Sequence, residues 1–190
     1  MSALALELRE KRDRLGIKGP RAAEWLAAQG IALPMTPNTW MHSEEALAAD
    51  ALLVARLGTA EFFLEDGAAG TTLKRISPAL DKSLPGVYPV LREDWGFVLG
   101  GEGVHDVLAQ VCNVNFAALS LDSRPLIMTL MIGVAVLVVP QRTSEGAAAE
   151  RPGPEERQYR IWCDPTFGPY LGASLGGVVI ECGGRYTGVS

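Results

Sequence analysis

The chain has 190 residues, of which 48% are hydrophobic and 21% are charged, and its formal net charge is −5. This composition excludes an intrinsically disordered chain, and the length is sufficient for one domain with a substantial core. The acidic balance and the scattered Lys and Arg residues disfavour nucleic acids and anionic membranes as main partners, because binding to phosphates needs a surplus of positive charge.

The sequence of the first 43 residues predicts helices followed by a loop. We expect residues 1–17 to form a polar helical arm outside a domain that spans residues 18–184. Pro20 starts a helix, because proline is favoured in the first helical turn, and Gly30 ends it. Residues 31–43 then predict an ordered loop.

Short strands alternate with amphipathic helices in the rest of the chain. The predicted strands comprise residues 51–57, 60–66, 87–94, 95–100, 126–131, 134–139 and 159–163, with a hairpin at Gly58-Thr59. The predicted helices comprise residues 71–79, a helix with Val104, Val107, Leu108 and Val111 on one face, and a helix capped by Asp164 that carries Phe167, Tyr170, Leu171 and Leu175 on one face. A strand followed by such a helix occurs twice, at residues 96–111 and 160–175.

These elements predict an α+β fold. Repeated strand–strand–helix units favour a mostly antiparallel sheet with the helices on one face. Residues 141–157 are polar and contain Gly and Pro, so we expect an exposed loop there, and we expect residues 185–190 to be a loose tail.

The chain is expected to be cytoplasmic. Its longest apolar run, residues 126–139, is shorter than a membrane span, and its N-terminus carries too many charges for a signal peptide. We therefore expect the three cysteines to be reduced, with Cys112 and Cys163 as small core residues.

The titratable side chains form no complete catalytic or metal site in the sequence. His105 and Asp106 are a candidate base and its orienter, but neighbours on a helix point in different directions, so we expect His105 to be a solvated residue at a helix start. Glu61, Glu65 and Asp66 are candidate carboxylates, and a solvated strand face is the alternative interpretation.

Two further features have a structural and a functional interpretation. The glycines of residues 100–103 lack the spacing of a dinucleotide-binding turn and predict only a turn before a helix. Trp40 and Trp95 lie near turns and are candidates for a protein interface, where tryptophan is enriched, with core packing as the alternative.

Several stretches together resemble the aminomethyltransferase family, of the glycine-cleavage T-protein type. The residues that carry the resemblance are Lys18-Gly19-Pro20-Arg21-Ala22 through Trp25-Leu26, residues 55–64 (ARLGTAEFFL), residues 107–115 (VLAQVCNVN), residues 132–136, Tyr159-Arg160-Ile161, and Phe167 with Tyr170-Leu171. Within this family the chain is most similar to the gamma subunit of heterotetrameric sarcosine oxidase, which is similarly short. The resemblance covers residues 18–176.

The resemblance implies a role in one-carbon metabolism. It implies an accessory subunit, without catalytic residues or a metal of its own, that supports the oxidative demethylation of an N-methyl amine such as sarcosine. Its partners would be flavoprotein subunits that hold FAD, FMN and NAD. Full-length aminomethyltransferases bind tetrahydrofolate, but this chain is about half as long, has no matching acidic residue near its start, and replaces a folate-site segment with residues 141–157.

Two alternatives stay open. The chain is a stand-alone tetrahydrofolate-binding or aminomethyl-transferring protein in the first alternative, with Glu61 and Asp66 as cofactor-binding carboxylates. In the second, it is a small interaction domain that kept the fold and lost the original role.

Overall fold

The structure is a computed structural model that describes residues 2–9, 12–43, 51–67, 70–80, 84–143 and 157–188. The chain divides into two compact units. We call residues 12–93 the smaller unit, and residues 1–11 together with 94–190 the larger unit. Among the described residues, no helix has the length and apolar character needed to cross a membrane.

The smaller unit is a five-stranded antiparallel sheet with the strand order β3-β4-β5-β2-β6. Its strands are β2 (Arg14–Lys18), β3 (Thr39–His42), β4 (Leu53–Arg56), β5 (Glu61–Glu65) and β6 (Tyr88–Val90), and its helices are α1 (Ala22–Ala28) and α2 (Thr72–Leu80). Alternate strand residues such as Ile17, Val54 and Phe62 form one core with Leu26 of α1 and Ile76 of α2.

The predicted hairpin between β4 and β5 is confirmed, and Arg56 holds it in place. Its guanidinium donates hydrogen bonds to the carbonyls of Gly58 and Thr59 within the turn, at 3.2 and 2.9 Å. It also donates to the carbonyls of Pro34 and Met35, at 3.2 and 2.9 Å. One arginine therefore satisfies four backbone acceptors and joins the turn to the segment before β3.

The larger unit is a six-stranded sheet with the strand order β11-β1-β7-β10-β9-β8. Its strands are β1 (Ala5–Leu8), β7 (Trp95–Gly100), β8 (Ile127–Met131), β9 (Val134–Arg142), β10 (Arg157–Cys163) and β11 (Arg185–Thr187). All neighbours are antiparallel except β1 and β11, which are parallel. The α+β class and the mostly antiparallel sheet are as predicted.

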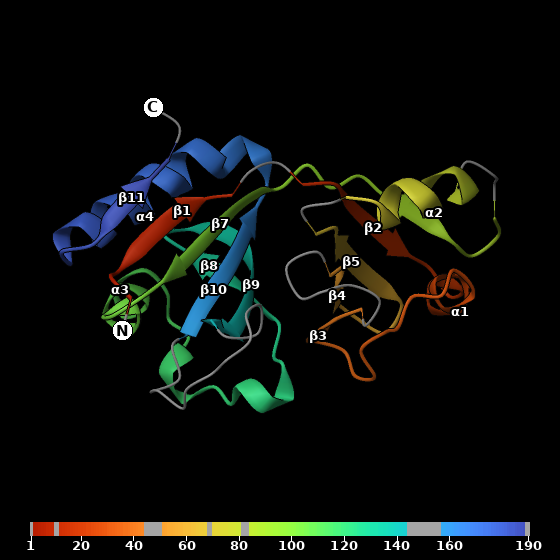
Figure 1. Cartoon of the computed structure of the whole chain (residues 1–190), viewed down its shortest axis with the longest axis horizontal. Helices are drawn as coiled ribbons and strands as arrows, with labels where there is room; N and C mark the ends of the chain where they lie inside the picture. Colours follow the sequence, from red (N-terminus) through yellow and green to blue (C-terminus); the bar gives the residue numbers. More distant parts are fainter. Residues whose placement is uncertain are drawn as a thin grey trace. The chain divides into compact units, whose positions relative to one another are not determined.

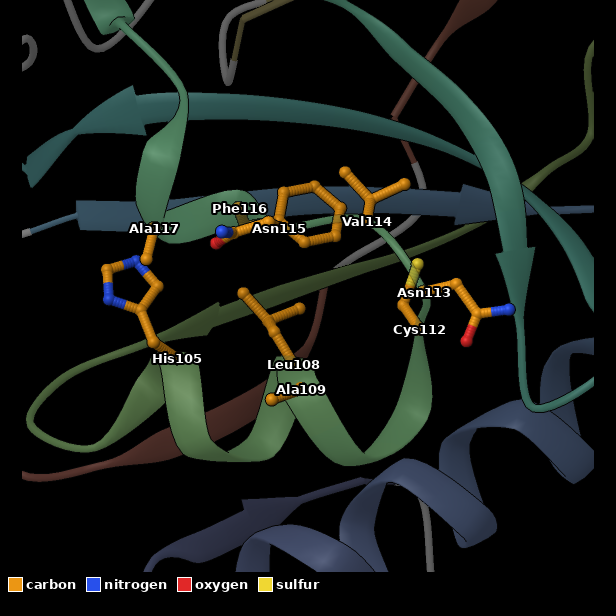
Figure 2. A pocket seen from close by; sticks show the side chains of 9 residues that line it. All are labelled: His105, Leu108, Ala109, Cys112, Asn113, Val114, Asn115, Phe116 and Ala117. Atoms are coloured by element: carbon orange, nitrogen blue, oxygen red, sulfur yellow. The ribbon is translucent and has the colours of Figure 1, made fainter.

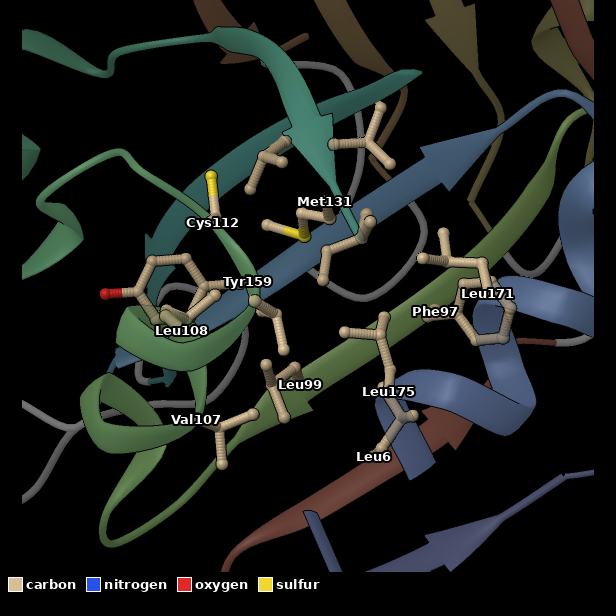
Figure 3. Packing of buried hydrophobic residues seen from close by; sticks show 14 of the residues in the cluster. Leu6, Phe97, Leu99, Val107, Leu108, Cys112, Met131, Tyr159, Leu171 and Leu175 are labelled. Carbon is tan, nitrogen blue, oxygen red and sulfur yellow. The ribbon is translucent and has the colours of Figure 1, made fainter. Parts of the chain in front are cut away.

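Two helices, α3 (Val104–Val111) and α4 (Gly168–Glu181), pack on one face of this sheet. Figure 3 shows Val107 and Leu108 of α3 and Leu171 and Leu175 of α4 pointing into the same core as the strand residue Phe97. Because α3 follows β7 and α4 follows the adjacent strand β10, the strand–helix repeat expected from the sequence is present.

Glycines let α4 pack closely on the sheet. A methyl group added to Gly168 would lie 2.2 Å from the Trp95 indole, and one added to Gly176 would lie 2.5 Å from the Tyr186 ring. The aromatic rings occupy the space that side chains would need. The prediction that Phe167 and Tyr170 lie on the buried face of this helix is therefore wrong, since they are 50% and 54% exposed.

The prediction of an N-terminal helical arm at residues 1–17 is also wrong, because β1 and β2 lie in that region. Leu4 and Leu6 are buried while Glu7 is exposed, which is the period of a strand rather than of a helix. β1 pairs with β7 on one side and with β11 on the other (Figure 1). Sheet pairing at both edges outweighs the helix propensity of Ala, Leu and Glu.

Two segments expected to be irregular contain strands. The predicted loop of residues 31–43 includes β3, which pairs with β4, and the predicted loose tail includes β11, which pairs with β1. A strand can form in such segments because a neighbouring edge supplies its hydrogen bonds. Of the predicted loop 141–157, residues 141–142 end β9 and residue 157 begins β10, and residues 144–156 lie outside the described part of the chain.

Candidate functional site

A small open cavity of about 340 Å³ lies where α3 meets the turn that follows it. This volume is near the lower end of the range typical of ligand pockets, roughly 300–1,000 Å³. Figure 2 shows that its walls come from α3 and from residues 112–117. The lining residues are His105, Leu108, Ala109, Cys112, Asn113, Val114, Asn115, Phe116 and Ala117.

His105, at the start of α3, is joined to the sheet by a hydrogen bond with Tyr159 of β10. The distance from His105 Nε2 to Tyr159 Oη is 2.7 Å, and the two rings meet edge to face. Arg157 interacts with the same tyrosine hydroxyl and also donates to the carbonyls of Phe116 and Leu119, at 3.2 and 3.1 Å. His105 is thus part of a network beside the cavity and not a solvated residue, which corrects the sequence-based expectation.

Burial controls the protonation of this pair. It lowers the pKa of His105 below its ordinary value, and the positive charge of Arg157 lowers it further, against a small opposing effect of Asp106. Burial also raises the pKa of Tyr159 above its ordinary value, although its contact with Arg157 opposes the shift. A neutral imidazole and a protonated phenol are therefore the stable forms at pH 7.

The imidazole tautomer sets the direction of this contact. His105 Nε2 either donates to the tyrosine oxygen or accepts from the tyrosine O–H. In both cases the contact engages Nε2 and holds the imidazole against the sheet.

The polar side chains that line the cavity are those of His105, Asn113 and Asn115. Figure 2 shows His105 and Asn113 at opposite ends, with Leu108, Val114 and Phe116 between them. General acid–base catalysis needs positioned groups that reach the same atom. The lining combines the imidazole of His105 and the amides of Asn113 and Asn115 with the apolar side chains of Leu108, Val114 and Phe116, so the cavity offers both polar and apolar contacts to a small molecule.

The predicted cofactor carboxylates lie apart, at opposite ends of β5. Glu61 is 45% exposed and forms an ion pair with Arg92, with 3.5 Å between Oε1 and Nη2. Asp66 is buried and accepts a hydrogen bond of 3.0 Å from the backbone N–H of Leu73, in the first turn of α2. Burial raises the pKa of Asp66, and the hydrogen bond from Leu73 partly opposes the shift. Their role in binding a cofactor stays a prediction.

Glu65 is paired with Arg14 inside the smaller unit. The distance from Arg14 Nε to Glu65 Oε2 is 2.6 Å, and the two side chains are 2% and 0% exposed. They lie opposite each other on the antiparallel strands β2 and β5. The expectation of a solvated strand face is therefore wrong for Glu65, because the arginine on the neighbouring strand compensates its buried charge.

The two tryptophans proposed for an interface are not prominent on the surface. Trp40 of β3 is 2% exposed, and Trp95 at the start of β7 is half-buried against Phe97 and Gly168. Their role at an interface stays a prediction.

Large exposed apolar side chains occur elsewhere in the larger unit, at places where the sequence analysis did not predict exposure. Met128 and Leu130 of β8 are 55% and 59% exposed, and Tyr170 and Ile180 of α4 are 54% and 59% exposed. Their strands and helix were predicted, but which face each element leaves open depends on the packing of the whole unit. Exposed apolar groups of this kind are typical of protein contact surfaces.

Comparison with known proteins identifies the fold. The sequence matches no protein-family model and no curated protein. Among solved structures, the chain is similar to the glycine cleavage system aminomethyltransferase T from Bartonella henselae, with a TM-score of 0.69 and 16% identity over 98% of this chain and 48% of that one. The chain therefore spans about half the length of that protein.

A second solved structure of the same fold is part of a larger assembly. The chain is similar to a chain of the heterotetrameric sarcosine oxidase from Corynebacterium sp. U-96, determined in complex with pyrrole 2-carboxylate. The TM-score is 0.65 and the identity 20%, over 97% of this chain and 87% of that one. The two similarities establish an aminomethyltransferase-like fold.

Proposed function

We propose that this chain is an accessory subunit of a multi-subunit amine-oxidising enzyme, similar to the gamma subunit of heterotetrameric sarcosine oxidase. The observation that carries the proposal is the match in extent, since 97% of the chain aligns with 87% of a chain from a heterotetramer. The aminomethyltransferase, in contrast, is matched over 48% of its length. This agreement in size favours a subunit of an assembly over a complete aminomethyltransferase.

An exposed apolar row on the larger unit supports this role. Met128 and Leu130 alternate with helix-facing residues on β8, which is the edge strand of its sheet. In register they lie opposite Leu137 and Ala135 of β9, so the four side chains share one face. An apolar row at a sheet edge is suited to contact with another subunit, and we assign it to the flavoprotein partners.

We assign the redox cofactors to the partner subunits on the basis of the chemistry of the described residues. The carboxylates of Glu61, Glu65 and Asp66 are engaged by Arg92, Arg14 and the start of α2. The oxidation of an N-methyl amine requires a cofactor that accepts electrons. In this proposal the partner subunits hold FAD, FMN or NAD, and this chain completes and stabilises the assembly.

Co-expression with flavoprotein subunits encoded by neighbouring genes tests the proposal. We expect a stoichiometric complex with flavin absorbance and N-methyl amine oxidase activity. We expect Met128→Asp and Leu130→Asp to reduce assembly, singly and more strongly together, whereas Met35→Asp, the same kind of change at a residue that is 89% exposed in the smaller unit, leaves it intact. A flavoprotein that is fully active without this chain, and that never co-elutes with it, would contradict the proposal.

Tetrahydrofolate is a second candidate, favoured by the fold shared with aminomethyltransferase T. Glu61 is the more accessible of the two predicted carboxylates and is the one to test. Calorimetric titration of the purified chain should then show saturable heat that is reduced in Glu61→Gln. Titration to millimolar tetrahydrofolate without heat would remove this candidate.

A further inference from the structure

Contacts from the sheet hold both walls of the cavity at α3 in position. On the α3 wall, His105 Nε2 lies 2.7 Å from the Tyr159 hydroxyl. On the other wall, Arg157 Nη1 donates to the carbonyls of Phe116 and Leu119, at 3.2 and 3.1 Å. Both anchoring residues belong to β10, so the fold itself keeps the two walls apart. Sites for small molecules are usually preformed in this way.

The C-terminal end of α3 is anchored as well. The backbone N–H of Ile132, in the turn between β8 and β9, donates to the carbonyl of Val111 at 3.0 Å. Cys112 Sγ lies 3.7 Å from Thr129 Oγ1 of β8. These contacts fix the start of residues 112–117, which form the second wall.

The lining of the cavity carries no charge at neutral pH. Among the described residues, the nine that line it include no Lys, Arg, Asp or Glu. Burial and the positive charge of Arg157 lower the pKa of His105 below its ordinary value of about 6.5, so this imidazole is neutral at pH 7. An ion that entered the cavity would lose hydration without gaining a charged partner from the lining. The cavity therefore favours an uncharged occupant.

The polar groups of the lining lie toward its ends, with apolar side chains between them. Figure 2 shows His105 and Asn115 toward one end, Asn113 at the other, and Leu108 and Phe116 on opposite walls. A carboxamide presents an N–H donor and a C=O acceptor side by side, which pair with the same two groups of another amide. A flat apolar ring fits between the walls. We propose that this cavity binds a small uncharged molecule in which an aromatic ring carries an amide group.

The size of the cavity limits the affinity. A cavity of about 340 Å³ that opens to solvent covers only part of the surface of a ligand. A probe with a single ring should therefore bind with a dissociation constant of roughly 1 mM. The site lies within the larger unit, and binding there does not depend on the accessory role proposed above.

Three probes of similar shape and different charge test the proposal. Benzamide is uncharged, benzamidine is a cation and benzoate is an anion, and saturation-transfer NMR follows the titration of each into the full chain at neutral pH. We expect benzamide to saturate the site and the two ions to bind at least about fivefold more weakly, because neither finds a charged partner in the lining. No saturable benzamide signal up to about 20 mM, or an ion that binds as tightly as benzamide, would overturn the proposal.

Two neighbouring alanines provide a matched pair of variants that locates the site. Ala117 lines the cavity and Ala118 does not, and both are exposed. Ala117→Trp should fill the cavity and weaken benzamide binding at least about tenfold, whereas Ala118→Trp should leave it unchanged. Circular dichroism would establish that both variants fold. Benzamide binding that is unaffected by Ala117→Trp, or weakened equally by the two variants, would show that the probe binds elsewhere.

Asn115→Leu tests the pairing of amides. The Asn115 side chain does not cap the turn that follows it, so its removal should leave the fold intact. We expect benzamide to bind about two- to tenfold more weakly to this variant, which is the modest contribution of a hydrogen bond that competes with water. Unchanged affinity in Asn115→Leu would contradict the recognition of an amide at this end of the cavity.

Discussion

Replacing either of two glycines of α4 by alanine tests how closely this helix packs on the sheet, and the two replacements should change stability in opposite directions. Gly168 and Gly177 both lie in the helix, and neither has a positive φ. Replacing a glycine by alanine inside a helix stabilises the folded chain by about 1 kcal/mol, because alanine loses less backbone entropy on folding. Only at Gly168 does the new methyl group meet an obstacle, since it would lie 2.2 and 2.4 Å from two atoms of the Trp95 indole.

The magnitudes follow from these contacts. Overpacking a well-filled site costs about 1–3 kcal/mol, and a contact more than 1 Å too short lies at the upper end. The helical gain at Gly168 is small because it is the first residue of α4, so Gly168→Ala should destabilise the chain by about 2 kcal/mol. Gly177→Ala should stabilise it by up to about 1 kcal/mol, because its methyl group meets no described atom within 4 Å.

Thermal unfolding measures both changes. For a chain of this size 1 kcal/mol corresponds to roughly 2–4 °C, so Tm should fall by about 4–8 °C in Gly168→Ala and rise by about 2–4 °C in Gly177→Ala. Urea titrations would give the same signs. If Gly168→Ala were as stable as the parent chain, the close packing of α4 on Trp95 would be refuted.

Three further predictions concern buried titratable groups. The fold lowers the pKa of His105, so the unfolded chain binds more protons than the folded chain near this pKa. The free energy of unfolding should therefore fall as the pH drops through about 6.5. In urea titrations from pH 8 to 5.5, His105→Gln should make this dependence on pH less steep. Glu65→Gln should cost about 3–5 kcal/mol in the same titrations, because it removes the carboxylate charge that lies 2.6 Å from the buried Arg14 guanidinium. Burial raises the pKa of Cys163 to about 11, so Ellman's reagent at pH 8 should modify Cys182 rapidly and Cys163 only after denaturation.

Each of these predictions has a control. Glu24→Gln removes an exposed ion pair with Arg21 and should leave stability unchanged within error, in contrast to Glu65→Gln. An unchanged pH slope in His105→Gln would show that the imidazole is not held neutral by the fold. Cys182→Ser should abolish the fast thiol reaction, and a remaining fast phase would show that a buried cysteine is accessible.

Local sequence patterns predicted most of the elements. The spacing of Val104, Val107, Leu108 and Val111 identifies the buried face of α3, and Pro20 with Gly30 brackets α1. These predictions succeed because helix periodicity, caps and tight turns depend on residues within a few positions of one another. The family resemblance likewise identified the fold, through the order and spacing of several short stretches.

The long-range side-chain contacts were less predictable, because the two partners are distant in sequence. His105 meets Tyr159, 54 positions away, and Arg14 meets Glu65, 51 positions away. Periodicity classed both His105 and Glu65 as solvated residues. Nothing in the local sequence indicates which side chain a long-range strand pairing will bring opposite another.

The sequence by itself determined an α+β chain of antiparallel strands and amphipathic helices, since these depend on short-range spacing and on composition. Tertiary structure alone decided that residues 5–8 and 185–187 are strands, because each of them forms only against a neighbouring edge. It also decided which face of α4 is buried, because the rings of Trp95 and Tyr186 fill the space beside its glycines and leave Tyr170 and Ile180 in solvent.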